Sequence, residues 1–215
     1  MNRTIYCISG LGTDERIFVN LSIDGYELKP IAWPPPAKKE SIESYALRLS
    51  ESIKEDNAIL LGVSFGGMLG IEIARQRHLH KLILVSSIKS SDELPRWMKI
   101  AGKLKLNKVL PTRSYSFTEA IDNNRLGVCT EEEKELARLL RQAACRIHLE
   151  WGINEILNWK NNWIPENVIH IHGENDKIFP VKKLRVDYMI KGATHMMIYN
   201  RAHEISNCIK EILNK

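Results

Sequence analysis

The amino-acid sequence predicts an α/β fold in which about six mostly parallel strands carry helices on both faces of the sheet. Short apolar runs alternate with longer amphipathic segments, the pattern of parallel strands joined by crossover helices. Residues 82–85 are all apolar, as expected of a strand that is covered on both faces. A further indication is the glycine-flanked serine at 62–66, which stands between an apolar run and a helix-like segment.

The first third of the chain is expected to supply three strands. The first strand is predicted at 4–9 and leads into a glycine-rich turn, after which Thr13 or Asp14 caps a helix. A weaker strand at 26–31 ends before three consecutive prolines, which cannot continue a helix or a central strand. The predicted elements that follow are a helix at 41–55, a strand at 58–63 and a helix at 67–77.

The gap between the strand at 82–85 and the next comparable strand, at 168–172, is far longer than a crossover requires. It should therefore hold an inserted subdomain. Thr130 and Glu133 form a capping box, and a helical apolar stripe follows, so the insertion is predicted to be helical. We predict a single core from 1–86 and 168–215, with 87–167 as helical cap insertion and crossover. The core ends with a strand at 185–190 and a helix at 202–213.

The pattern Gly62-Val63-Ser64-Phe65-Gly66 has the spacing of a nucleophile elbow. A serine on a sharp strand-to-helix turn has a strained backbone, and the flanking glycines let the strand and the helix pass closely. A serine hydroxyl is a poor nucleophile at neutral pH, so it needs a base and a group that orients the base. Asp176 and His195 both follow predicted strands, where loops gather at the ligand edge of such a sheet; Glu174 is an alternative acid.

With these motifs in this order, the chain resembles the α/β-hydrolase superfamily, as a compact member with a helical cap. The resemblance is specific at four blocks, around Gly10, Ser64, Asp176 and His195. It implies that Ser64 is the nucleophile, His195 the general base and Asp176 the orienting acid, and the family's Gly-x-x-Asp-x-x-x-Pro spacing favours Asp176 over Glu174. It also implies that the backbone N–H groups of Leu11 and Phe65 form the oxyanion hole.

The sequence departs from the family pattern in two places. Ser9 stands where the loop after the first central strand usually has histidine. Only three residues precede the first predicted strand, so the antiparallel pair that commonly begins this fold should be absent.

The resemblance implies a serine hydrolase that cleaves a small ester, thioester or related carbonyl compound through an acyl-enzyme, with no metal or organic cofactor. Two alternatives stay open. A lyase or C–C bond hydrolase of the same fold would use the same three residues, and a non-catalytic receptor could keep the pocket without turnover.

Aromatic and basic side chains of the insertion suggest how a substrate could bind. Trp97 and Trp151 lie in the insertion and Trp33 in the proline-rich loop, and we expect these rings to line the substrate pocket. A basic amphipathic stretch could dock an acidic carrier or a phosphorylated thioester. Its cationic residues are Arg96, Lys99, Lys103, Lys105, Lys108 and Arg113.

Composition excludes several other classes. The 215-residue chain has a net charge of +5, far from the dense basic tracts of nucleic-acid-binding proteins. No segment approaches the length of a membrane span or has the pattern of a signal peptide, so we expect a cytoplasmic protein. The four cysteines form no Cys-x-x-Cys pair, and His170 with His172 lacks a third ligand, so no metal site is predicted.

Overall fold

The computed structural model describes residues 3–105 and 123–214. In this part of the chain a six-stranded sheet has the order β2-β1-β3-β4-β5-β6, and every neighbouring pair is parallel. This confirms the predicted sheet of about six parallel strands. The strands are β1 (Arg3–Ile8), β2 (Tyr26–Pro30), β3 (Ala58–Val63), β4 (Leu79–Val85), β5 (Val168–Gly173) and β6 (Tyr188–Ile190).

The strand order reverses direction at β1, which lies between β2 and β3. The chain passes from β1 to β2 on one side and then continues through β3 to β6 on the other. At such a switch point the loops after the two central strands separate and leave a crevice at the carboxyl ends of the strands. The loop after β1 and the turn after β3, which carries Ser64, both lie at this crevice.

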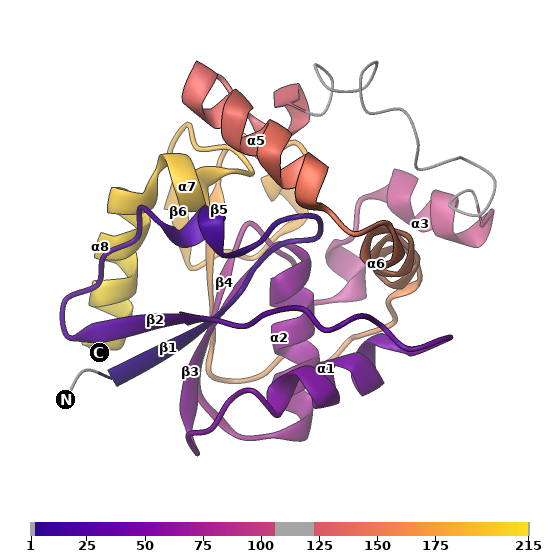
Figure 1. The fold of residues 1–215 in the computed structure, drawn as a ribbon, viewed down its shortest axis with the longest axis horizontal. Coiled ribbons are helices and arrows are strands. Elements are labelled where there is room, and N and C mark those ends of the chain that lie inside the picture. The colour runs from indigo at the N-terminus through magenta and orange to yellow at the C-terminus, as the bar shows by residue number, and fades with distance from the viewer. Residues whose placement is uncertain (1–2, 106–122, 215) are drawn as a thin grey trace.

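Helices cover both faces of the sheet, as predicted (Figure 1). One face packs against α1 (Ile42–Ser50) and α2 (Phe65–Gln76), and the other against α8 (Ala202–Leu213). Side chains alternate between the two cores along each strand: in β1, Tyr6 belongs to the α1/α2 core and Cys7 to the α8 core.

Some predicted elements are shorter in the structure. The helix expected after the glycine-rich turn is a 3-10 turn, η1 (Glu15–Phe18), which Asp14 caps. Helix α1 ends at Ser50 rather than Glu55, because the amides of Ser52 and Ile53 bond to carbonyls three residues earlier and tighten the chain into turns.

The inserted segment is helical where the structure describes it. It contains η2 (Ser91–Glu93), α3 (Arg96–Lys103), α5 (Glu131–Ala143) and α6 (Arg146–Asn158), and the capping box of Thr130 and Glu133 is confirmed. The prediction that one helical apolar stripe runs from Leu136 through Ala144 to Ile147 is wrong. Ala144 and Cys145 are extended, so α6 starts out of register with α5 and Ile147 is 60% exposed.

None of the helices in the described ranges is long and apolar enough to cross a membrane.

Candidate active site

The turn between β3 and α2 holds Ser64 in a strained conformation. Its φ of 53° and ψ of −119° lie where residues other than glycine are rarely found. Neighbouring backbone explains why glycine stands on both sides. A Cβ on Gly66 would lie 2.3 Å from the carbonyl oxygen of Ser9, and one on Gly62 would lie 2.6 Å from that of Gly66. The serine is therefore presented by a turn that only this glycine spacing permits.

Replacing Gly66 with alanine should disturb both folding and the position of Ser64. The added methyl would meet the carbonyl oxygens of Ile8, the last residue of β1, and of Ser9, which follows it. Overpacking of this kind costs about 1–3 kcal/mol of unfolding free energy. Chemical denaturation of the Gly66→Ala protein measures the effect, and stability equal to the wild type would show that the turn is less crowded than described.

Ser64, His195 and Asp176 form one continuous hydrogen-bonded chain. His195 Nε2 lies 3.0 Å from Ser64 Oγ, and His195 Nδ1 lies 2.7 Å from Asp176 Oδ2. The other oxygen of Asp176 accepts hydrogen bonds from the amides of Ile178 and Phe179, at 2.8 and 2.9 Å. Each of the three residues follows the carboxyl end of a strand (β3, β5 and β6), although they are far apart in sequence. The structure thus brings together all three residues that the sequence singled out.

The alternative acid, Glu174, does not reach His195 by any contact in the described structure. Its carboxylate accepts a hydrogen bond from the amide of Gly192 at 2.9 Å, which ties the β5 loop to the turn before His195. The acid beside the histidine is therefore Asp176, and Glu174 holds the loop that carries that histidine.

The electrostatics of Asp176 fix the tautomer of His195. Burial by itself would raise the pKa of Asp176, but the charge and hydrogen bond of His195, together with His172 and the amide of Phe179, outweigh burial and hold that pKa below its ordinary value. The carboxylate stays ionised at neutral pH and can only accept hydrogen bonds. His195 Nδ1 therefore carries the hydrogen, and Nε2 is free to accept the proton of Ser64.

Two buried histidines extend this chain behind Asp176. His172 Nε2 lies 2.8 Å from the carbonyl oxygen of Phe179 and 3.4 Å from Asp176 Oδ2. Because a carbonyl only accepts, His172 Nε2 carries a hydrogen, and its Nδ1 accepts from His170 Nε2 at 3.0 Å. Sequence reasoning missed this role; the only signal was the i, i+2 spacing that places both histidines on one face of β5.

Both histidines are neutral in the folded protein. Burial lowers the pKa of His170 well below its ordinary value, and His172 and Lys89 lower it further. Burial also lowers the pKa of His172, although Asp176 opposes the shift. Within the described residues no group of three or more histidine, cysteine or acidic side chains could hold a metal ion.

These shifts predict acid-sensitive stability. Because both folded pKa values are lowered, the unfolded chain binds protons below about pH 6.5 that the folded chain does not bind. The free energy of unfolding should then decrease as the pH is lowered, by about 1.4 kcal/mol per pH unit for each such proton. Urea denaturation between pH 7.5 and 5.5 measures this slope. His170→Phe should flatten the slope; a wild-type protein of constant stability would contradict the assignment.

The two backbone groups predicted for the oxyanion hole lie at the same crevice. Leu11 is in the loop after β1, and Phe65 is the first residue of α2, where the helix dipole favours negative charge. Neither N–H donates to another backbone group in the part of the chain described here. Ser9 donates its hydroxyl to the Thr13 carbonyl at 3.0 Å and closes this loop.

A cavity of about 300 Å³ opens beside Ser64 and His195. Its walls are largely apolar, and the inserted segment supplies part of them through Leu140 and Leu149, while Arg125 and Arg141 also line it. The insertion therefore borders the cavity at Ser64 directly.

The structure places the three predicted pocket tryptophans elsewhere, and none of them lines the cavity at Ser64. Trp33 lines a neighbouring cavity. Trp151 packs between the rings of Tyr45 and Phe65, with centroids 4.3 and 5.6 Å away. Trp97 is 56% exposed on α3.

Comparisons with known proteins bear on the fold. No family model matches the sequence, and no curated protein matches it. Solved structures do match over nearly the whole chain. An esterase from Thermogutta terrifontis is 15% identical with a TM-score of 0.70, and the match covers 100% of this chain and 90% of that one. The α/β-hydrolase family protein from Desulfitobacterium hafniense is 20% identical with a TM-score of 0.63, covering 99% and 96%.

The chain has the α/β-hydrolase fold. Structures with this fold differ in chemistry: the meta-cleavage product hydrolase from Pseudomonas fluorescens IP01 is 15% identical with a TM-score of 0.69, covering 99% of this chain and 91% of that chain. At these identities the α/β-hydrolase fold is what the chain shares with them, and function has to be argued from the site.

Proposed function

We propose that this protein is a serine hydrolase that cleaves a small ester, thioester or related carbonyl compound through an acyl-enzyme. The observation that carries the proposal is the hydrogen-bonded chain from the half-buried Ser64 to the buried His195 and Asp176. A serine within hydrogen-bond reach of an imidazole that a carboxylate orients is the arrangement that activates a hydroxyl for attack.

The reaction then has two steps. Ser64 Oγ attacks the carbonyl carbon while His195 Nε2 takes its proton, and the N–H groups of Leu11 and Phe65 bind the oxyanion. The intermediate collapses as His195 returns the proton to the leaving alcohol or thiol. Water, deprotonated by His195, attacks the acyl-enzyme and releases the acid and Ser64. Asp176 holds the imidazole in the required tautomer throughout, and His172 positions Asp176 from behind.

Selectivity is assigned to the inserted segment. We propose that 87–167 acts as a cap on the core of 1–86 and 168–215, and the support for this is that Leu140 and Leu149 line the cavity at Ser64. The apolar walls suit an acyl chain of a few carbons.

A carrier-linked thioester is a more specific form of the same proposal. Helix α3 exposes Trp97 and Ile100, Leu104 is exposed directly after it, and the basic residues of the helix flank this apolar stripe. Such a surface would suit an acidic carrier. Lys108 and Arg113, which belong to the predicted basic stretch, lie outside the described residues.

Rapid mixing with p-nitrophenyl esters of two to eight acyl carbons tests the proposal. An acyl-enzyme that hydrolyses more slowly than it forms predicts a burst of about one p-nitrophenol per protein before steady turnover, with rates that depend on acyl length. A receptor would give neither burst nor turnover above the buffer rate. If esters are not cleaved but a vinylogous diketone is, the C–C bond hydrolase alternative replaces the ester proposal.

A further inference from the structure

A second cavity adjoins the one at Ser64. It has a volume of about 270 Å³ and shares four lining residues with the first cavity. The shared residues are Gly12, Thr13, Leu140 and Ala144. The loop that carries the predicted oxyanion donor thus runs between the two cavities. A substrate held at Ser64 has this second space next to it.

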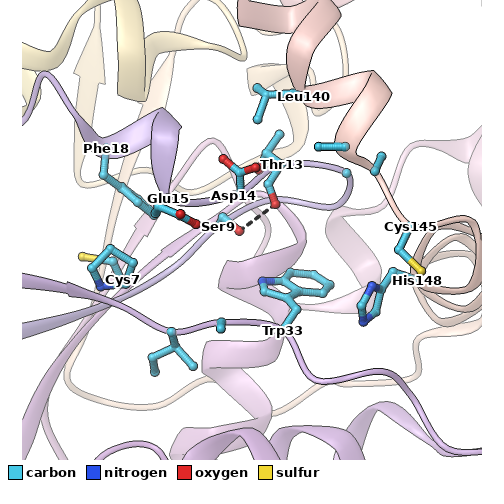
Figure 2. A pocket seen from close by; sticks show the side chains of 16 residues that line it. Cys7, Ser9, Thr13, Asp14, Glu15, Phe18, Trp33, Leu140, Cys145 and His148 are labelled. Atoms are coloured by element: carbon cyan, nitrogen blue, oxygen red, sulfur yellow. Dashed lines mark hydrogen bonds between the residues drawn. The ribbon is translucent and has the colours of Figure 1, made fainter.

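The chemistry of the second cavity differs from that of the first. Polar side chains line it, including the hydroxyl of Ser9, the carboxylates of Asp14 and Glu15 and the imidazole of His148 (Figure 2). The aromatic ring of Trp33 forms one wall. An apolar acyl chain is therefore better matched to the Ser64 cavity, and a polar group is better matched to the second cavity.

The indole N–H of Trp33 is the most informative group in this cavity. Its nitrogen is buried and has no hydrogen-bond partner among the described residues. In Figure 2 this nitrogen is at the end of the ring nearer Ser9 and Glu15. The ring is held in place by Phe65 and His148, with centroids 5.7 and 6.0 Å away. A fixed donor without a partner is costly to bury, so a ligand with an acceptor atom would be stabilised here.

The charges of the cavity limit which acceptor fits. Arg16 binds Asp14 through hydrogen bonds of 2.8 and 2.6 Å, and these hold the pKa of Asp14 below its ordinary value, so Asp14 stays ionised. Glu15 adds a second carboxylate. The guanidinium of Arg16 offsets the charge of Asp14, and the carboxylate of Glu15 then disfavours an anionic ligand. An ammonium ligand would suit the carboxylates but cannot accept from the N–H of Trp33. A hydroxyl group can accept from Trp33 and also donate to a carboxylate.

We propose that this cavity binds an uncharged, hydroxylated alcohol portion of the substrate, while the Ser64 cavity holds the acyl chain. The preferred substrate class is then an ester of a short acyl chain with a polyol. This inference rests on the proposed hydrolase function, and a binding experiment separates the two.

The binding experiment uses the Ser64→Ala protein and the five tryptophan indole N–H signals in a ¹⁵N NMR spectrum. Trp33→Phe identifies the Trp33 signal by its loss. Glycerol monobutyrate should shift this signal downfield in a saturable way, whereas propyl butyrate and a glycerol phosphate ester should shift it far less. A Trp33 signal that moves equally with all three ligands, or with none, overturns the proposal whether or not the wild type hydrolyses esters.

The kinetic experiment compares kcat/KM for glycerol monobutyrate and propyl butyrate. The wild type should favour the glycerol ester about tenfold, the value expected of one well-placed hydrogen bond. Trp33→Phe keeps an aromatic ring and should abolish most of this preference, while exposed Trp163→Phe should keep it. Equal rates for the two esters in the wild type would overturn the proposed alcohol class, and absence of any hydrolysis would instead refute the hydrolase function.

Discussion

Ser64→Ala should lower kcat for ester hydrolysis by about 10⁴- to 10⁶-fold, because the attacking atom is lost while the rest of the site remains. The substitution removes only a hydroxyl, so the fold and the two adjoining cavities should be retained. KM or the dissociation constant for a substrate should therefore change little. Steady-state kinetics with the best ester of the acyl series, together with circular dichroism of the variant, measures both parts of this expectation.

A matched control is available in Ser52, which is exposed and lies beyond the end of α1. Ser52→Ala should keep wild-type kinetics. If Ser64→Ala retains more than a few per cent of the activity, the hydrolysis does not pass through this serine, and the nucleophile has to be sought elsewhere in the chain.

Asp176→Asn should lower kcat by about 10³- to 10⁴-fold. The amide can donate a hydrogen bond to His195 Nδ1, and this favours the tautomer in which Nε2 carries the hydrogen. His195 could then no longer accept the proton of Ser64, from which its Nε2 is 3.0 Å away. The loss should therefore appear in kcat, with substrate binding much less affected.

The neighbouring carboxylate offers the discriminating control. Glu174→Gln changes the same charge two residues away, at a group that bonds Gly192 rather than His195. We expect at most a few-fold loss of kcat for this variant. If Glu174→Gln were the more damaging of the two substitutions, the assignment of Asp176 as the acid that orients His195 would be wrong.

Much of the fold was predictable because its signals are local. Continuous apolar runs mark buried parallel strands, and β3 and α8 begin and end at the predicted residues. The meeting of Ser64, Asp176 and His195 was also predictable, because each follows a strand and parallel strands bring their carboxyl ends to one edge.

The residues that line the cavity at Ser64 were harder to predict from the sequence. Whether a tryptophan lines a cavity depends on the path of its helix. The break between α5 and α6 falls at Ala144 and Cys145, where no glycine or proline indicates it in the sequence. Trp151 packs into the core as a result of that path, while Trp97 faces outward. The buried pair of His170 and His172 needed three-dimensional contacts as well, because two histidines on a strand face fit many environments.

The central claim, that Ser64 is an activated nucleophile, is tested most directly by covalent labelling. The protein is treated with a fluorophosphonate, digested, and the adduct located by mass spectrometry. Ser64 Oγ should displace fluoride from phosphorus and give one adduct per chain, on the peptide that contains Ser64, and Ser64→Ala should give none. An unlabelled wild-type protein, or an adduct that persists in Ser64→Ala, would contradict the account.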